Sequence, residues 1–259
     1  MIEVQKNEMG AIAPLFEGIQ ETLIWSCLDG SMGRAFAGGE NPPEAAQIVN
    51  GDFCFFAGDS GVPSAKELVS NNPTNRNCMY LVPNDEGWSR LIETVYGERA
   101  ERITRYAFHK DGDVFDRKHL KSLSDNLPGE FSLTPIGEKE YHLVLREEWS
   151  RDFCQNFLSS KDYVSRGLGF VAWHNGKIVA GASSYTVYNG GIEIEIATRE
   201  DYWRKGLATV CGAKLILTCL TKGLYPSWDA ANLNSVGLAK KLGYHYDRAY
   251  PAYRVLRDG

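Results

Sequence analysis

The stretch from residue 192 to residue 216 constrains this chain more than any other part of it. It begins as an alternation of isoleucine and glutamate, passes through a short charged turn, and continues with helical spacing. The turn ends in Arg204-Lys205-Gly206-Leu207-Ala208-Thr209. A strand that leads through small residues into a helix exposes main-chain N–H groups and the positive end of the helix dipole. These features together favour a binding site for a phosphate group.

Composition and charge exclude several other classes of protein. The chain has 259 residues, 43% of them apolar, which is enough for one large domain or two modest ones. A formal net charge of −5 provides no basic field for nucleic acid. The six cysteines and five histidines show no metal-ligand spacing, and we find neither a secretion signal nor an apolar run of membrane-spanning length. We therefore expect a cytoplasmic protein without metal, nucleic-acid or membrane partners, whose oligomeric state the sequence does not indicate.

The second half of the chain has the clearer pattern of strands and helices. An Asn-Gly pair and an Asn-Gly-Gly run separate three apolar stretches, as in an antiparallel meander. The predicted elements are strands at 169–174, 177–188 and 192–198, a helix at 206–221, a strand at 224–228, a helix at 232–242 and a hairpin at 244–255. Cys211 falls on the packing face of the first helix, so we do not expect it to be a nucleophile.

The first half shows similar elements with weaker turn signals. The predicted elements are helices at 11–28, 42–48 and 85–96 and strands at 33–37, 52–57, 79–83 and 101–108. The charged segment 111–130, interrupted by glycine and proline, is the predicted boundary. We therefore expect an N-terminal α/β domain at 1–130 and a second domain at 131–259. The halves share no sequence repeat, although their element order could be similar.

Three motifs in the second half resemble the GNAT superfamily of acetyl-coenzyme A-dependent N-acetyltransferases. They are residues 193–209, the Asn-x-x-Ser start at Asn232, and the Leu-Gly-aromatic end at Leu242-Gly243-Tyr244. The whole-chain layout is most similar to the bacterial group that includes the zwittermicin A resistance proteins. The resemblance implies an α/β (α+β) fold with a mixed, mostly antiparallel sheet flanked by helices. It also leaves room for a degenerate copy of this topology in the N-terminal half, which would shape the substrate cleft.

The resemblance also implies which residues bind acetyl-coenzyme A (acetyl-CoA). Trp203, Arg204, Lys205, Gly206, Leu207, Ala208 and Thr209 would wrap the diphosphate, although Trp203 stands where the family has Arg or Gln. Ile196, Ala197 and Thr198, in a strand that parts from its neighbour, would hold the pantetheine arm and the thioester carbonyl. Asn232 and Ser235 match the second cofactor motif. Asn232 also fits the N-cap position of its helix.

Two carboxylates on the preceding strand are candidates for the general base. Glu193 and Glu195 alternate with isoleucines, so they share one face, which we expect to look into the acceptor cleft. An amine must lose a proton before it attacks a thioester, and a carboxylate partly removed from water can accept that proton. The pair could instead bind a cationic substrate, or form an ordinary solvated face.

The general acid of the family is missing from its usual place. Ala239 stands where the resemblance implies a tyrosine that protonates the leaving thiolate. Tyr244 is the candidate replacement, with Tyr246, Tyr250 and Tyr253 also near in sequence, although aromatic residues on terminal strands usually belong to the core. A thiolate can also leave without a dedicated acid.

Three functions therefore remain open. The first is transfer of an acetyl group from acetyl-CoA to a primary amine of a small molecule, a metabolite or an antibiotic, by direct attack in a ternary complex. The second is binding of acyl-CoA without turnover, suggested by Trp203 and Ala239. The third is a two-lobed interaction module, suggested by N-terminal aromatics that look exposed in the sequence: Trp25, Phe53, Phe55, Phe56 and Trp88.

Overall fold

Two series of hydrogen-bonded strands organise the chain, one in each of the two units into which it divides. The computed structural model describes residues 1–39, 41–74 and 76–256. The first unit comprises Met1–Arg105 with Ala249–Gly259, and the second comprises Tyr106–Arg248. The division therefore falls after Arg105, whereas the sequence indicated a boundary at 130, and the chain returns to the first unit at its end.

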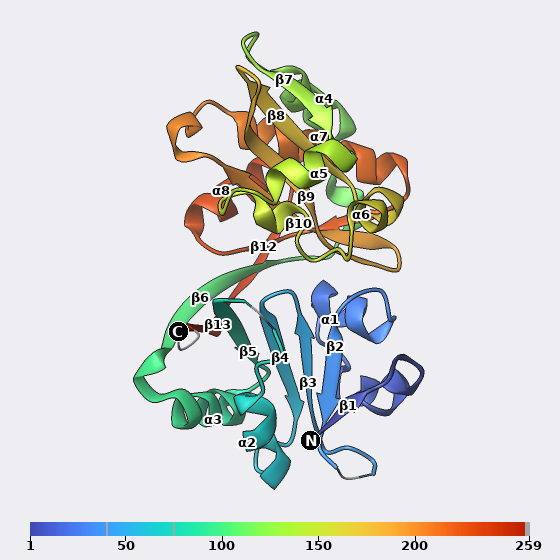
Figure 1. Cartoon of the computed structure of the whole chain (residues 1–259), viewed down its shortest axis with the longest axis vertical. Coiled ribbons are helices and arrows are strands. Elements are labelled where there is room, and N and C mark those ends of the chain that lie inside the picture. The colour runs from blue at the N-terminus through green and yellow to red at the C-terminus, as the bar shows by residue number, and fades with distance from the viewer. Residues whose placement is uncertain (40, 75, 257–259) are drawn as a thin grey trace. The chain divides into compact units, whose positions relative to one another are not determined.

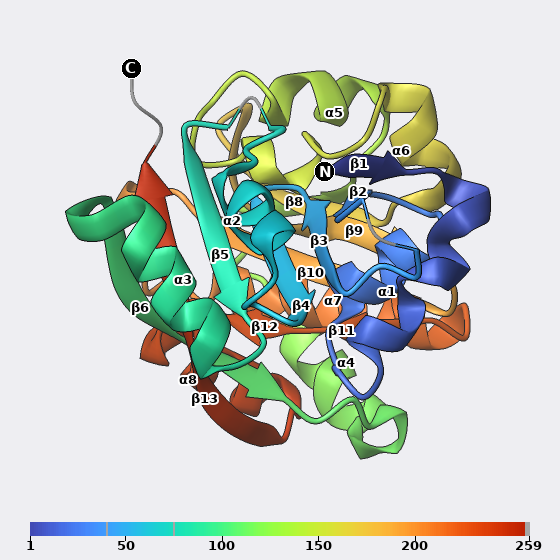
Figure 2. The same cartoon turned by 90° about the horizontal axis from the view of Figure 1, so that it is seen from below.

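The first unit alternates strands and short helices. Its elements are β1 (Ile2–Val4), η1 (Lys6–Ala11), η2 (Ala13–Phe16), α1 (Thr22–Leu28), β2 (Arg34–Ala37), β3 (Ala45–Asn50), β4 (Phe53–Gly58), α2 (Pro63–Ser70), β5 (Cys78–Pro83), α3 (Glu86–Tyr96) and η3 (Gly97–Arg99). Strands β6 (Ala100–Phe108) and β13 (Tyr246–Leu256) each contain a point of division between the units. Figure 1 shows β1 to β5 side by side, and Figure 2 shows α2 and α3 over one face of these strands.

The second unit contains both elements that the sequence predicted and elements that it did not predict. They are η4 (Gly112–Val114), α4 (Arg117–Asp125), β7 (Ser132–Pro135), α5 (Glu138–Val144), η5 (Arg151–Phe153), α6 (Ser160–Arg166), β8 (Gly169–His174), β9 (Lys177–Tyr188), β10 (Gly191–Thr198), η6 (Glu200–Tyr202), α7 (Leu207–Thr221), β11 (Tyr225–Ser227), β12 (Asp229–Ala230) and α8 (Leu233–Leu242). The predicted meander and both predicted helices are confirmed.

The two units repeat one pairing order. The first unit has the order β1-β2-β3-β4-β5, and the second has β7-β8-β9-β10-β11. Every neighbouring pair in each series is antiparallel except the last, β4 with β5 and β10 with β11, which is parallel. The expected mixed, mostly antiparallel sheets flanked by helices are thus present. Because a parallel pair requires a crossover, α2 and α7 occupy corresponding places in the two units.

Three predicted elements were wrong. Residues 45–50 form the buried strand β3 rather than a helix, because Ile48 and Val49 pair between β2 and β4. The predicted helix 11–28 is interrupted at Gly18, whose φ is 82°, and only α1 is α-helical. The predicted C-terminal hairpin is the single strand β13, since the φ of Pro251 is compatible with extended backbone.

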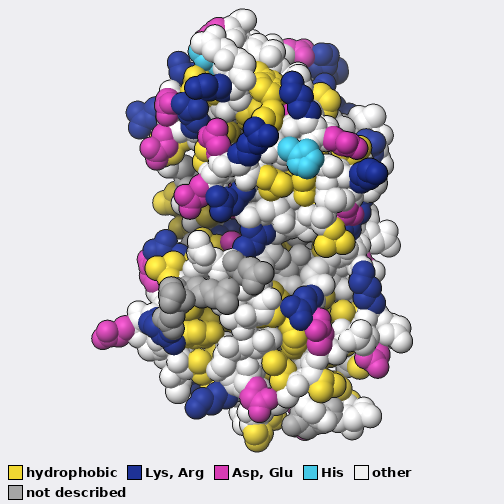
Figure 3. Space-filling view, viewed as in Figure 1, with side chains coloured by type: hydrophobic (Ala, Val, Ile, Leu, Met, Phe, Trp, Pro, Cys, Tyr) yellow, Lys and Arg dark blue, Asp and Glu magenta, His cyan; other side chains and the backbone are white. Residues whose placement is uncertain are grey.

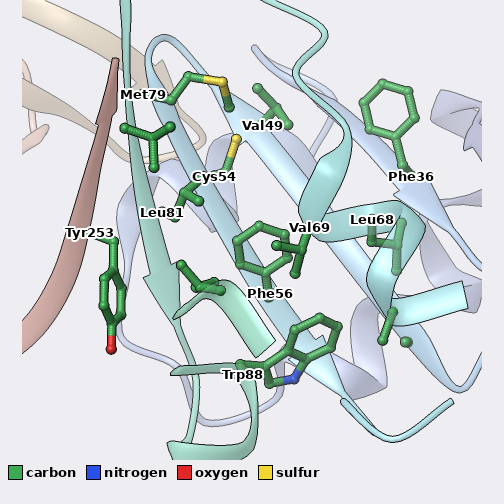
Figure 4. Packing of buried hydrophobic residues seen from close by; sticks show 14 residues of the cluster. Phe36, Val49, Cys54, Phe56, Leu68, Val69, Met79, Leu81, Trp88 and Tyr253 are labelled. Carbon is green, nitrogen blue, oxygen red and sulfur yellow. The ribbon is translucent and has the colours of Figure 1, made fainter. Parts of the chain in front are cut away.

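The hydrophobic core of the first unit contains most of the aromatic residues that looked exposed in the sequence. Trp88 and Phe56 are buried and stack with ring centroids 5.3 Å apart. The Trp88 indole also donates a hydrogen bond of 3.0 Å to the carbonyl of Gly58. Figure 4 shows both side chains among the residues of this cluster, and Phe55 is buried as well. The expectation that Phe55, Phe56 and Trp88 form an exposed surface was therefore wrong.

Candidate functional site

The loop between β10 and α7 adopts an unusual backbone conformation. Arg204 has a φ of 62°, which is uncommon for a residue with a side chain. Gly206, with φ 80° and ψ 0°, precedes α7 as its N-cap and provides no side-chain cap. A Cβ built at Gly206 would meet no atom within 4 Å, so the backbone conformation rather than crowding favours glycine here. Two left-handed residues thus turn the chain directly into the first turn of α7.

The first turn of α7 presents main-chain donors. The first hydrogen bond within the helix runs from the N–H of Val210 to the carbonyl of Gly206, at 3.1 Å. The N–H groups of Leu207, Ala208 and Thr209 therefore precede the helical ladder, and no described residue accepts a hydrogen bond from them. The dipole of the helix adds positive potential at this end. This arrangement fits the diphosphate of a cofactor.

The strand before the loop parts from its neighbour. β11 pairs with β10 only from Gly191 to Glu193, and β10 continues to Thr198 beyond that pairing. On the other side, β9 pairs with β10 along its whole length, and the N–H of Arg199 bonds to the carbonyl of Val179 at 3.0 Å. By the alternation of antiparallel pairing, Ala197 also directs its main-chain groups to β9. Ile196 and Thr198 direct theirs to the open edge, so the register favours Ile196, rather than Ala197, as a main-chain contact there.

Trp203 ties the loop to the end of this strand. Its indole N–H donates a 2.6 Å hydrogen bond to the carbonyl of Thr198, while its side chain is 59% exposed. The residue at the first position of the loop motif thus contacts the protein's own main chain. The Thr198 carbonyl is thereby occupied, which leaves the N–H of Thr198 and both main-chain groups of Ile196 facing the open edge.

Glu193 and Glu195 do lie on one face of β10. A Cβ built at Gly212 of α7 would lie 3.2 Å from Cδ1 of Ile196, so the Ile196 side chain points to α7. The two glutamates alternate with Ile196 along the strand and therefore lie on the opposite face. Glu193 is only 4% exposed and Glu195 is half-buried. Glu193 pairs with Thr186 of β9 and with Ser227 of β11. The pair with Ser227 is the last before β10 and β11 separate.

The surroundings of Glu193 include residues that the sequence did not reveal. The Lys110 ammonium donates a 2.8 Å hydrogen bond to Oγ of Ser227, the neighbour of Glu193 on β11. Burial, with the charges of Glu193 and Asp111 nearby, raises the pKa of Tyr225. Lys110 and Ser227 are far apart in the chain, and neither belongs to a motif, so sequence alone contained no signal for this contact.

Tyr244 belongs to the core of the second unit. It is 2% exposed, and its hydroxyl donates a 2.5 Å hydrogen bond to the carbonyl of Pro226. Burial raises its pKa well above the usual value. The ring also lies against Phe115 and Trp228, with centroids 4.9 and 5.4 Å away. Because its proton is engaged by a main-chain carbonyl, we do not include Tyr244 in the proposed chemistry.

The start of α8 has a clear structural role. Oδ1 of Asn232 accepts a 3.0 Å hydrogen bond from the N–H of Ser235, which confirms the N-cap expected from the sequence. Oγ of Ser235 in turn accepts a 3.2 Å hydrogen bond from the Trp228 indole. Both side chains thus hold α8 and the end of β11 in place, whatever else they contact.

The described part of the chain contains neither a candidate metal site nor a candidate membrane-spanning helix. Among residues 1–39, 41–74 and 76–256, we find no group of three or more His, Cys, Asp or Glu side chains that could hold a metal ion. No helix in these ranges is long and apolar enough to cross a membrane. Figure 3 shows basic and acidic side chains interspersed over the face in view, without a continuous basic patch.

Comparison with known proteins identifies the family. The family model for GNAT acetyltransferases matches residues 13–253, so the chain belongs to the GNAT acetyltransferase family. A Bacillus subtilis (strain 168) protein described as the uncharacterized N-acetyltransferase YdfB is 23% identical, over 97% of each chain.

Solved structures agree with this assignment. A GCN5-related N-acetyltransferase-like protein from Streptococcus suis 89/1591 is 45% identical, with a TM-score of 0.90 over 96% of this chain and 98% of that one. A tandem GNAT protein from the clavulanic acid biosynthesis pathway is only 12% identical, with a TM-score of 0.56 over 100% of this chain and 98% of that one. The latter likeness concerns the fold alone.

Proposed function

We propose that this chain transfers an acetyl group from acetyl-CoA to a primary amine of a small molecule, by direct attack within a ternary complex. The observation that carries the proposal is the juxtaposition of two sets of main-chain groups in the second unit. The N–H groups that begin α7 have no acceptor among the described residues, and no described strand pairs with the adjacent edge of β10 beyond Glu193. Membership of the GNAT family supports acetyl-CoA as the donor.

The main chain would bind and orient the cofactor. The N–H groups of residues 206–209 would donate to the diphosphate, and Arg204 and Lys205 would add positive charge at the rim. The N–H of Ile196 would donate to the thioester carbonyl oxygen, where negative charge develops as the amine attacks. Acetyl-CoA, when bound, supplies an acetyl group activated as a thioester.

Proton transfer from the amine is assigned to Glu193 or Glu195. Glu193 is the more buried and lies where β10 and β11 separate, while Glu195 lies beside the open edge. Either carboxylate could accept the proton directly or through a water. No described tyrosine is assigned to the leaving group, because Ala239 is buried at the family position and Tyr244 is engaged elsewhere. The thiolate, with a pKa of about 8.5 in free thiols, can depart without an acid.

The first unit repeats the strand order of the second unit but does not repeat the row of main-chain N–H donors found at the start of α7. Its corresponding helix α2 begins with Pro63, which has no N–H, and the Asp59 carboxylate accepts the N–H of Gly61 at 2.7 Å. Trp88 donates to the carbonyl of Gly58 at the end of β4, and β5 pairs with β4 as far as Phe56. We infer that the first unit binds no CoA.

Calorimetric titration with CoA should therefore give one site per chain. The expected stoichiometry follows from the contrast between the main-chain donors in the first turn of α7 and the proline and carboxylate around the start of α2. Two equivalent sites would contradict the inference that the first unit is a degenerate copy.

The amine substrate is proposed to be cationic. Two glutamates on the face next to the open edge suit an ammonium group before it is deprotonated. The similarity of layout to the zwittermicin A resistance group further supports a small polyfunctional metabolite or antibiotic. All six cysteines are free, and burial raises the pKa of each thiol (Cys27, Cys211 and Cys219 to about 12). Unpaired cysteines fit a reducing compartment, for which we propose the cytoplasm.

A screen for amine-dependent release of CoA from acetyl-CoA tests the function. Amino acids, polyamines, aminoglycosides and peptide N-termini should be compared, and at least one small cationic amine is expected to support steady release. Binding of acetyl-CoA without release for any amine would favour the second function, an acyl-CoA-binding protein without turnover.

A further inference from the structure

A small pocket opens beside the proposed diphosphate loop, within the second unit. Its volume is about 290 Å³, and it lies between the end of α4, the start of α7 and the end of α8. Lys205, Gly206 and Thr209 line one side, Asn126 and Lys241 another. The volume lies just below the range for small-molecule sites, about 300–1,000 Å³, so it suits one group of a larger ligand.

The polar groups around this pocket are mostly hydrogen-bond donors. Two ammonium groups, a hydroxyl and a carboxamide line it, and no carboxylate does. The nearest acidic residue in sequence, Asp125, pairs with Lys121 at 2.7 Å. Neither Lys205 nor Lys241 forms an ion pair with any described residue. The lining is therefore complementary to an anion.

Lys241 contacts both α4 and α7. Its carbonyl accepts a 2.9 Å hydrogen bond from Nε2 of His119, and its ammonium donates a 3.4 Å hydrogen bond to Oγ1 of Thr209, in the first turn of α7. The ammonium is thus directed toward the start of α7.

We propose that this pocket binds the 3′-phosphate of coenzyme A, an inference that rests on the proposed function. The pocket shares Lys205, Gly206 and Thr209 with the loop assigned to the diphosphate, so its occupant lies next to that group. In the proposed function the pantetheine arm would leave the diphosphate toward β10. The part of CoA on the other side of the diphosphate is the adenosine, whose ribose carries a phosphate monoester. A dianion there would contact Lys241 and Lys205.

Binding of CoA and of 3′-dephospho-CoA by the full chain tests this proposal without any turnover. Isothermal titration should use phosphate-free buffer with the wild type, K241M, K205M and the control K240M. Lys240 is exposed on α8, and its ammonium lies over the ring of Tyr246, 5.3 Å from the centroid, outside the pocket lining. We expect the wild type to prefer CoA by about tenfold, K241M to lose most of that preference, and K240M to keep it.

The outcomes distinguish failure of the 3′-phosphate assignment from failure of the proposed cofactor site. Equal affinities of the wild type for the two ligands, or equal weakening of both by K241M, would overturn the 3′-phosphate assignment and leave the diphosphate loop intact. Inorganic phosphate that binds alone and leaves the affinity for CoA unchanged would assign the pocket to free phosphate instead. Failure of both nucleotides to bind the wild type would overturn the cofactor site itself and this inference with it.

Discussion

Gly206→Glu is expected to weaken CoA binding by about 100-fold or more. The added carboxylate would stand among the N–H donors of residues 206–209, where it repels the diphosphate and competes for the same hydrogen bonds. In the protein itself a Cβ at this position meets nothing within 4 Å, so the fold has room for the side chain. Titration calorimetry with CoA measures the effect directly.

Gly206→Gln is the matched control for this substitution. Both variants place a side chain of the same length on a residue with φ 80°, so both carry the same backbone strain. The glutamine lacks the charge, and we expect it to weaken binding clearly less than the glutamate. Thermal unfolding should be similar for the two. Retained affinity in Gly206→Glu would remove the basis for placing the diphosphate at this loop.

Replacing the general base should lower turnover by about 10²- to 10⁴-fold. Glu193→Gln and Glu195→Gln should be compared separately, because each removes one carboxylate while preserving the size of the side chain. The residue that accepts the proton of the amine is the one whose loss has the large effect. The deficit should be greatest at low pH, where the amine is hardest to deprotonate, and smaller at high pH, where free amine is present without a base.

The measurement is kcat/KM across pH for both variants and for Glu148→Gln, a control at an exposed carboxylate. A variant that alters only KM for a cationic amine would indicate electrostatic binding by that glutamate rather than catalysis. Wild-type rates in both variants at every pH would exclude the pair as the base.

The elements around the candidate site could be predicted from sequence because their signals are local. The turns at Asn175-Gly176 and Asn189-Gly190 bound β9, and Gly206 and Gly243 mark the start of α7 and the end of α8. In contrast, β3 was mistaken for a helix because its strand character comes from pairing on both sides with β2 and β4. Tertiary context outweighed local propensity at that strand.

Side-chain environments were harder to predict than elements. The alternation of Glu193 and Glu195 follows from the period of a strand, but nothing local indicates that Glu193 is almost fully buried beside Ser227. The role of Trp203 was equally hidden, since its bond to Thr198 depends on the path of the whole loop. Tyr244 looked available because it belongs to a recognised motif, whereas its hydroxyl is directed at a carbonyl in the core. Such contacts arise from segments that meet only after folding.

We propose that the main chain at residues 204–209 holds a diphosphate and thereby directs a thioester to the open edge of β10. A crystal structure of the protein with CoA would decide whether it does. We predict diphosphate oxygens within hydrogen-bond distance of the N–H groups of residues 206–209, and the pantetheine arm along Ile196 and Thr198. Electron density for CoA at any other place, or a β10 edge fully paired with β11 beyond Glu193, would contradict the claim.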